Sequence, residues 1–164
     1  MARSSRKILI ASGVNLDLLG RREPSVYGVA TLRDMEKMVK ESYRKYLIEK
    51  RLQAYQLIFF QSNDEARFLR ELDRGYAGAV INAGAWTHTS LALADRLVGV
   101  PLPFVEAHVS NLLTRESFRQ HSFLAEHAIC VVQGLGIQSY WVAFEALLEY
   151  LSSAKNPPVQ KYRS

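Results

Sequence analysis

Three side chains that can take part in acid–base chemistry lie at alternate positions of one short segment. Glu106, His108 and Ser110 occupy positions i, i+2 and i+4 in a stretch that otherwise resembles a buried strand. Successive side chains of a strand point to opposite faces, so these three share one face. A carboxylate, an imidazole and a hydroxyl are costly to bury unless they face a cleft or one another. The spacing therefore predicts the floor of an active site.

Two arginines follow this segment and suggest an anionic ligand. Arg115 and Arg119 are four residues apart, so they are neighbours if the segment is helical. Guanidinium groups bind carboxylates and phosphates well because their donors match the geometry of these anions. We therefore expect the active site to bind an anion.

A long loop near the start of the chain carries a candidate base. Residues 13–28 form a connection too long for a simple link between a strand and a helix, and such loops tend to be lids or binding loops. The loop contains Arg22 and Tyr27. A phenol has an ordinary pKa of roughly 10, and a downward shift of about 3 units corresponds to about 4 kcal/mol of differential stabilisation. Arg22 and Arg115 are candidates for the guanidinium groups that would stabilise the Tyr27 phenolate and so lower its pKa. The alternative is a surface loop whose tyrosine packs on the domain.

A second polar segment, residues 82–90, connects a strand to a helix and contains Asn82 and His88. Thr87 or Thr89 can cap that helix, which would place His88 at its positive end. A positive environment disfavours the imidazolium, so His88 suits a neutral hydrogen-bonding role. The alternative is an incidental histidine beside a helix cap.

Short apolar strands alternate with amphipathic helices along the whole chain. We expect strands at 7–11, 57–60, 79–81, 104–109 and 129–132, and helices beginning at 31, at 63 or 64, at 87 and at 137. This alternation predicts an α/β fold: one flavodoxin-like domain over residues 1–154, with a five-stranded parallel sheet in the order 2-1-3-4-5 and helices on both faces. Residues 155–164 are expected to form a frayed tail. Ligands of such sheets bind beyond the carboxyl ends of the strands, where the polar segments above converge.

The composition excludes several other classes of protein. Of the 164 residues, 48% are hydrophobic and 23% are charged, which is typical of a globular protein. A single cysteine, Cys130, excludes an internal disulfide framework. The net charge is +5, but the sequence contains no basic runs with interleaved aromatic residues, so we expect no nucleic-acid partner. No apolar run is long enough for a signal peptide or a membrane span, and we expect a cytoplasmic protein.

Several cofactor and nucleophile motifs are missing or incomplete. Gly134 and Gly136 supply only two glycines of the dinucleotide fingerprint, and they follow the last expected strand instead of the first. The spacing of Glu106 and His108 fits no common zinc motif. A triad of Ser110, His88 or His108, and Asp95 would lack a strand-turn-helix nucleophile elbow. None of these patterns is complete enough to indicate a metal or cofactor site.

Taken together, the polar motifs resemble those of type II 3-dehydroquinate dehydratase, and the resemblance covers residues 7–151. The matching segments are Gly13-x-Asn15-Leu-x-x-Leu-Gly-x-Arg-Glu-Pro-x-x-Tyr27-Gly, Gln61-Ser-Asn63, Asn82-Ala-Gly-Ala-x-Thr-His88-Thr-Ser, Val105-Glu-x-His108-x-Ser-Asn111, Arg115-Glu-x-Phe-Arg119-x-His-Ser122 and Gly134-Leu-Gly136. The resemblance implies trans-elimination of water from 3-dehydroquinate to give 3-dehydroshikimate, a step of the shikimate and quinate pathways, with no metal and no organic cofactor.

The resemblance also implies a role for each catalytic residue. Tyr27 would remove a proton from carbon 2, with its pKa lowered by Arg22 and with Arg115 assisting. Asn15 would hold a water that stabilises the enolate. His108 would be the general acid for the departing hydroxyl, oriented by Glu106.

The remaining positions imply substrate binding and assembly. Asn82, Ser110 and the backbone at Val109 would bind the substrate carboxylate, and His88 and Arg119 its ring hydroxyls. Asp95 would reach the site of a neighbouring subunit, since the family forms trimers assembled into dodecamers.

Two departures from the family pattern lie in the long loop: Val14 replaces a usual proline, and Asp17 stands where asparagine is common. Two other functions remain possible from the sequence. One is a catalytically weakened or non-catalytic flavodoxin-like binder of small anions, and the other is a metal-dependent hydrolase on the same fold.

Overall fold

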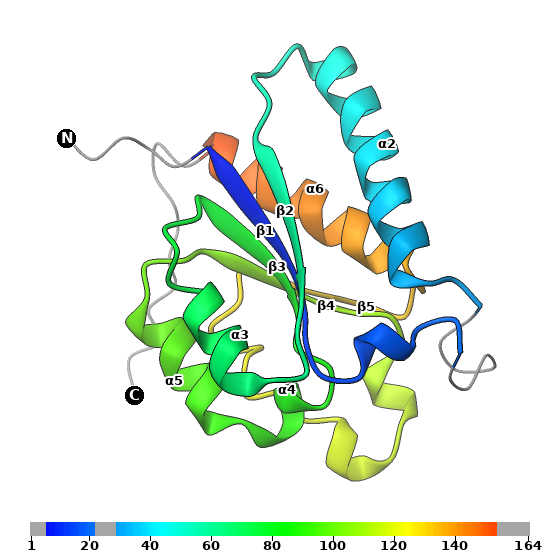
Figure 1. The fold of residues 1–164 in the computed structure, drawn as a ribbon, viewed down its shortest axis with the longest axis vertical. Helices are drawn as coiled ribbons and strands as arrows, with labels where there is room; N and C mark the ends of the chain where they lie inside the picture. Colours follow the sequence, from blue (N-terminus) through cyan, green and yellow to red (C-terminus); the bar gives the residue numbers. More distant parts are fainter. Residues whose placement is uncertain (1–5, 22–28, 154–164) are drawn as a thin grey trace.

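Five parallel strands form one twisted sheet in the computed structural model, which describes residues 6–21 and 29–153 (Figure 1). The strand order is β2-β1-β3-β4-β5, as the sequence predicts. The inner strands β3 and β4 are buried along their whole length, including the polar Glu106 and His108 of β4. The strands are β1 (Lys7–Ser12), β2 (Gln56–Gln61), β3 (Gly78–Asn82), β4 (Phe104–His108) and β5 (Val131–Gln133).

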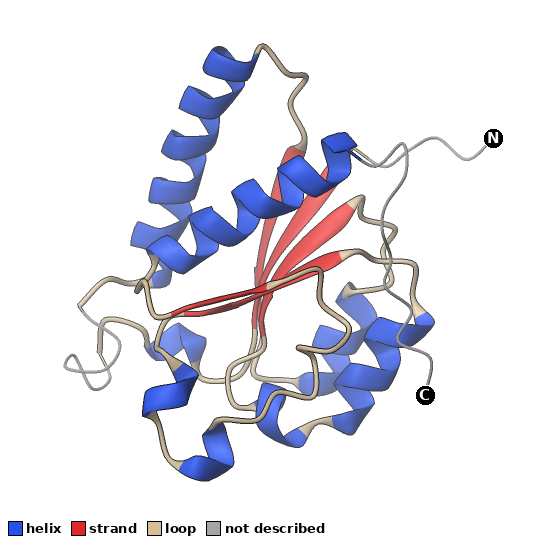
Figure 2. Cartoon of the chain, turned by 180° about the vertical axis from the view of Figure 1, so that it is seen from behind, coloured by secondary structure: helices blue, strands red, loops and turns tan. Residues whose placement is uncertain are grey.

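Helices cover both faces of this sheet (Figure 2). One face packs against α2 and α6, and the other against α3 and α5. The fold is therefore the α/β arrangement with a doubly covered sheet that the alternating pattern predicts. The helices are α2 (Leu32–Lys50), α3 (Glu65–Glu71), α4 (Trp86–Thr89), α5 (Leu91–Gly99) and α6 (Gln138–Ser153).

Local sequence signals define where the first two long helices begin. Thr31 and Asp34 form a capping box at the start of α2, in which each side chain accepts a hydrogen bond from the backbone of the other residue. Asp64 caps α3 through the backbone N–H of Arg67. Both caps agree with the boundaries expected from the sequence.

The single helix expected to begin at residue 87 is instead two helices, α4 and α5. Ser90 has an extended backbone between α4 and α5, and its hydroxyl accepts the Leu93 N–H at 2.9 Å. Ser90 is therefore the cap, and the prediction that Thr87 or Thr89 caps the helix is wrong. His88 consequently lies in the last turn of α4 and not at the first turn of a long helix.

Strand β4 divides its side chains between the two faces as the alternation predicts. Val105 and Ala107 join the core beneath α2 and α6, and Val109 follows them. Glu106 and His108 point to the opposite face. The last strand begins two residues later than expected, although the Ile129 N–H already bonds to the Phe104 carbonyl at 2.8 Å.

No helix in the described part of the chain is long and apolar enough to cross a membrane.

Candidate active site

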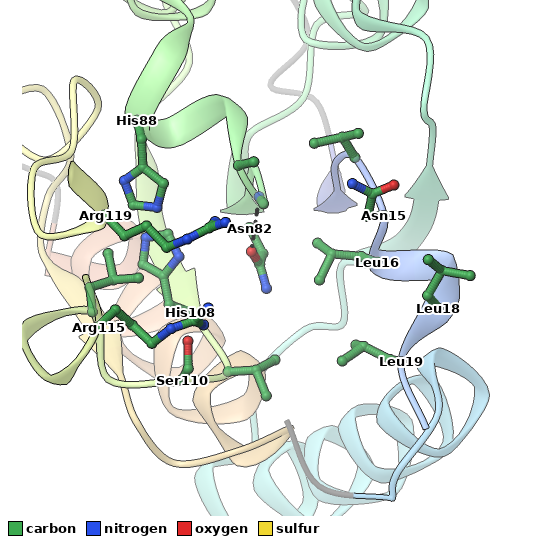
Figure 3. A pocket seen from close by; sticks show the side chains of 15 residues that line it. Asn15, Leu16, Leu18, Leu19, Asn82, His88, His108, Ser110, Arg115 and Arg119 are labelled. Atoms are coloured by element: carbon green, nitrogen blue, oxygen red, sulfur yellow. Dashed lines mark hydrogen bonds between the residues drawn. The ribbon is translucent and has the colours of Figure 1, made fainter. Parts of the chain in front are cut away.

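A pocket opens where the carboxyl ends of β1, β3 and β4 meet (Figure 3). One side of it is formed by the polar and charged side chains of His88, His108, Ser110, Arg115 and Arg119. The other side is formed by apolar side chains of the first loop, which follows β1: Leu16, Leu18 and Leu19. The pocket thus combines one polar, cationic wall with one apolar wall. The lining residues are Val14, Asn15, Leu16, Leu18, Leu19, Asn82, Gly84, Ala85, His88, His108, Val109, Ser110, Leu112, Arg115 and Arg119.

A buried carboxylate lies directly beneath His108. The Glu106 side chain is fully buried and its Oε1 is 2.7 Å from Nε2 of His108, which is 4% exposed. A carboxylate can only accept, so Nε2 of His108 carries a hydrogen and donates it. Nδ1 is then the ring nitrogen that Glu106 does not engage. This pairing fixes the orientation of the imidazole ring.

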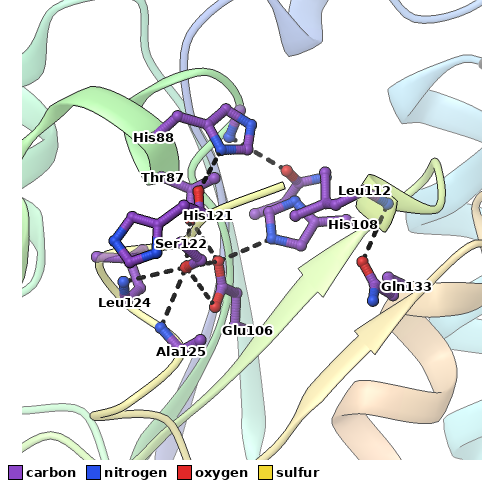
Figure 4. A network of polar contacts seen from close by, with 12 residues as sticks. Thr87, His88, Glu106, His108, Leu112, His121, Ser122, Leu124, Ala125 and Gln133 are labelled. Atoms are coloured by element: carbon purple, nitrogen blue, oxygen red, sulfur yellow. Dashed lines mark hydrogen bonds and ion pairs between the residues drawn. The ribbon is translucent and has the colours of Figure 1, made fainter. Parts of the chain in front are cut away.

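Two hydroxyl groups complete the surroundings of the Glu106 carboxylate (Figure 4). The Thr87 hydroxyl donates to Oε1, and the Ser122 hydroxyl lies 2.7 Å from Oε1 and 2.9 Å from Oε2. Burial acts to raise the pKa of Glu106, but the hydrogen bond and charge of His108 and the two hydroxyls outweigh it and hold the pKa below its ordinary value. Glu106 is therefore a carboxylate at neutral pH although it is fully buried.

Ser122 is in turn held by its own backbone contacts. Its hydroxyl oxygen accepts the N–H groups of Leu124 at 3.0 Å and Ala125 at 3.1 Å. With both N–H donors on the oxygen, its hydrogen is directed to the carboxylate. The segment after Arg119 thus places Ser122 against the Glu106 carboxylate.

The surroundings of His88 favour a neutral ring that can accept a hydrogen bond. Its Nδ1 lies 2.7 Å from the His121 carbonyl, which can only accept, so Nδ1 carries the hydrogen. Burial lowers the pKa of His88, and the hydrogen bond to His121 opposes this only in part. In the neutral ring Nε2 is left as an acceptor, which suits a ligand hydroxyl. The neutral state expected from the sequence is thus supported, with burial instead of a helix terminus as the main cause.

Arg115 and Arg119 are held together by one carboxylate. Glu116 Oε2 lies 3.4 Å from Arg115 Nε and 3.3 Å from Arg119 Nε. The two arginines lie on the short 3-10 turns η2 (Leu112–Thr114) and η3 (Ser117–Arg119) or directly after them, and not on one helix as the four-residue spacing suggested. Two guanidinium groups against one carboxylate leave net positive charge at the pocket wall, which favours an anionic ligand.

The first loop approaches the loop after β3 closely. The Gly13 N–H donates to the Asn82 carbonyl at 2.7 Å, and a Cβ on Gly84 would lie 2.5 Å from the Val14 carbonyl oxygen. Gly84 also has a φ of +62°, which a residue with a side chain adopts at a cost. This contact brings Asn15 and Asn82 to the same pocket.

Most of the candidate residues from the sequence converge here. Among the pocket-lining residues are Asn15, Asn82, His88, His108, Val109, Ser110, Arg115 and Arg119. Glu106 lies below the pocket floor in contact with His108. Asp95 is exposed on α5 and does not line the pocket. Arg22 and Tyr27 lie outside the described residues.

The sequence does not predict the contacts of Thr87 and Ser122 with Glu106. The pattern around Thr87 favours a helix cap, and no pattern assigns a role to Ser122. The signal that the sequence offers is that Thr87 and Ser122 both lie within segments that match the family motifs. The described residues contain no group of three or more His, Cys, Asp or Glu side chains placed to bind a metal ion.

Comparison with known proteins gives a consistent result. The family described as "Dehydroquinase class II" matches residues 6–148. A 3-dehydroquinate dehydratase of Prochlorococcus marinus subsp. pastoris is 45% identical over 148 residues, covering 88% of this chain and 97% of that protein. A catabolic 3-dehydroquinase of Clavispora lusitaniae is 40% identical over 149 residues, covering 88% of this chain and 99% of that protein.

A solved structure agrees with these sequence relatives. The type II dehydroquinase of Propionibacterium acnes superposes with a TM-score of 0.79 at 33% identity, covering 90% of this chain and 99% of that one.

Proposed function

Because this chain belongs to the class II dehydroquinase family, we propose that it dehydrates 3-dehydroquinate to 3-dehydroshikimate. The single observation that carries the proposal for this site is the Glu106–His108 pair at the base of a cationic pocket. An anionic ring with a hydroxyl leaving group needs both features: positive charge to bind its carboxylate, and an acid to protonate the departing oxygen.

The first step is removal of a proton from carbon 2, next to the ketone. The Tyr27 phenolate takes this proton, and the electron pair moves into the ketone to form an enolate. Arg22 and Arg115 favour the phenolate by their charge. Asn15 lines the pocket and holds the water that stabilises the enolate oxygen.

The second step is expulsion of the hydroxyl on carbon 1. The enolate reforms the ketone, a double bond forms between carbons 1 and 2, and the C1–O bond breaks. His108 gives its proton to the departing oxygen, so water leaves. Since Nε2 is engaged by Glu106, the proton comes from Nδ1. Solvent later restores the proton to His108 and removes the one on Tyr27.

The remaining polar groups bind the substrate. Asn82, Ser110 and the backbone at Val109 bind the carboxylate, and all three residues line the pocket. Arg119 and His88 bind ring hydroxyls, for which the Nε2 of His88 is an acceptor. Asp95 is exposed on α5, as a residue serving a neighbouring subunit must be.

The biological setting follows from the same proposal. The reaction is a step of the shikimate pathway, which leads to aromatic amino acids, and it takes place in the cytoplasm. The chain assembles into trimers and these into a dodecamer. The name of the Clavispora lusitaniae relative assigns that protein to catabolism. The same dehydration can serve either aromatic biosynthesis or quinate breakdown.

Formation of the conjugated enone tests the proposal. Addition of 3-dehydroquinate to micromolar protein should produce the ultraviolet absorbance of 3-dehydroshikimate at a rate proportional to protein concentration. Tyr27→Phe and His108→Ala should lower the rate by about two orders of magnitude or more, since each removes a proton-transfer group. Absence of the absorbance with the wild-type protein would leave a non-catalytic binder of small anions.

A further inference from the structure

Asn15 is held in an unusual backbone conformation. Its φ is +63°, in the left-handed region, where few residues other than glycine are found. Asparagine tolerates this region better than most residues, but the conformation still has to be held by contacts. The direction of the Asn15 side chain into the pocket depends on it (Figure 3).

The contact that holds it comes from a distant segment. The Asn15 backbone N–H donates to Oδ1 of Asn63 at 2.8 Å, and Asn63 follows the carboxyl end of β2. The same oxygen accepts from Nε2 of Gln61 at 3.0 Å, and that Nε2 also lies 3.3 Å from the Gly13 carbonyl. The edge strand of the sheet is thereby connected to the loop that carries Asn15.

The orientation of the Asn63 amide is determined by a carboxylate. Asn63 Nδ2 donates to Asp17 Oδ1 at 3.1 Å. A carboxylate only accepts and a backbone N–H only donates, so the amide has one orientation that satisfies both neighbours. If it flipped, its oxygen would face the Asp17 carboxylate and its NH2 would face the N–H of Asn15.

We infer that Asn63 and Asp17 are positioning residues for Asn15: Asn63 fixes the Asn15 backbone, and Asp17 fixes the direction of the Asn63 amide. The inference rests on the proposed function, in which Asn15 acts on the developing enolate. Asp17, which stands where asparagine is common in the family, therefore has a structural task at this site. Neither residue lines the pocket, so neither touches the substrate.

The consequence is a selective effect on turnover. A group that acts on charge developing in the transition state changes kcat, while binding of the ground state is left nearly unchanged. Loss of the Asn63 contact should therefore lower kcat and leave KM within a factor of about two. A loss of general stability would not produce this separation.

An exchange of the two side chains tests the inference. In Asn63→Asp a second carboxylate faces Asp17, and kcat should fall by about tenfold or more through misplacement of Asn15. In Asp17→Asn the new amide oxygen still accepts from Asn63 Nδ2, so kcat should stay near the wild-type value. When both substitutions are combined, the amide at position 17 can donate to the carboxylate at position 63. That carboxylate still accepts from Asn15 and Gln61, so most of the lost kcat should return.

The matched control is Glu36→Gln, which alters a partly exposed carboxylate paired with Lys40 on α2, away from the pocket. It should leave kcat and KM unchanged. Asn63→Ala, at an exposed position, serves if Asn63→Asp does not fold; its kcat should fall while KM and Tm stay near those of the wild type.

Two results would overturn the inference: full kcat in Asn63→Asp or Asn63→Ala, or a double variant as slow as Asn63→Asp alone. An inactive wild-type protein would instead contradict the proposed function, so the two failures are distinguishable.

Discussion

Glu106 and His108 form a buried pair in which Oε1 and Nε2 are 2.7 Å apart at the carboxyl end of β4. A carboxylate taken out of water is stabilised only if its hydrogen-bonding capacity is satisfied. Thr87 and Ser122 provide this for the carboxylate, while the imidazole faces the pocket. The pair therefore holds the His108 ring at the pocket, with its partner carboxylate fully buried beneath it.

Because the pKa of Glu106 is lowered in the folded protein, the stability of the fold should decrease at acidic pH. A carboxyl whose folded-state pKa is lower than its unfolded value stabilises the fold above the unfolded pKa, here the ordinary value of 4.5. This stabilisation is lost as pH falls from that value through the lowered pKa. The Tm of the wild type should therefore fall more steeply below pH 4.5 than the Tm of Glu106→Gln. Equal slopes of Tm against pH in thermal unfolding would contradict the ion-paired state of Glu106.

Thr87 and Ser122 should control the acid limb of the activity profile. Both hydroxyls favour the charged form of Glu106, so Thr87→Val or Ser122→Ala should raise its pKa. The carboxylate is then protonated at a higher pH, and the acid limb of the profile of kcat/KM against pH should shift to higher pH. Rates measured across pH check this shift.

The control for this experiment is Thr89→Val. Thr89 is in the same short helix, and its hydroxyl bonds only to the Ala85 carbonyl among the described residues. Its profile should coincide with that of the wild type. An acid limb that moves equally in Thr87→Val and Thr89→Val would show that the effect is not carried by Glu106.

Arg119 should contribute mainly to substrate binding. It lines the pocket, and hydrogen bonds involving a charged group contribute roughly 1.5–3 kcal/mol, so Arg119→Ala should raise KM by about tenfold or more. The increase should shrink at high salt because added ions screen the charge of Arg119 in the wild type and so reduce what its removal costs. Steady-state kinetics at two ionic strengths measure both effects. Arg44→Ala, an exposed arginine on α2, is the control and should leave KM unchanged.

Gly84 should tolerate no side chain. Its φ is +62° and an added Cβ would lie 2.5 Å from the Val14 carbonyl oxygen, so Gly84→Ala combines backbone strain with a clash. Strained backbone of this kind costs about 1–3 kcal/mol, and Tm and activity should both fall. Gly99→Ala meets no atom within 4 Å and should keep the wild-type Tm. A Gly84→Ala protein with unchanged Tm would show that the two loops can separate freely.

The periodic features of the chain are predictable from the sequence. Burial on both faces of a parallel sheet leaves a mainly apolar run, and this identifies β1 and β3 and supports the strand order. The alternation in β4 places Glu106 and His108 on one face, because a strand offers only two directions to its side chains. The capping box of Thr31 and Asp34 is a local signal, and it predicts the start of α2 correctly.

The wrong helix cap has its physical origin in competition for hydroxyl groups. Thr87, Thr89 and Ser90 can all cap a helix, and local sequence does not distinguish them. The choice is made by Glu106, nineteen residues away, which engages Thr87 and leaves Ser90 as the cap of α5. The same limit applies to Ser122 and to Asn63, whose partners are brought close only by the assembled sheet.

The stereochemistry of proton loss tests the central claim most directly, since base and acid must act from opposite faces of the ring. 3-Dehydroquinate labelled with deuterium at one of the two positions on carbon 2 is converted by the wild-type protein, and the label in the product is measured by mass spectrometry. Deuterium on the face opposite the departing hydroxyl should be lost to solvent, and deuterium on the same face should remain in 3-dehydroshikimate. Loss of the label from the same face as the hydroxyl would contradict a base facing His108 across the substrate.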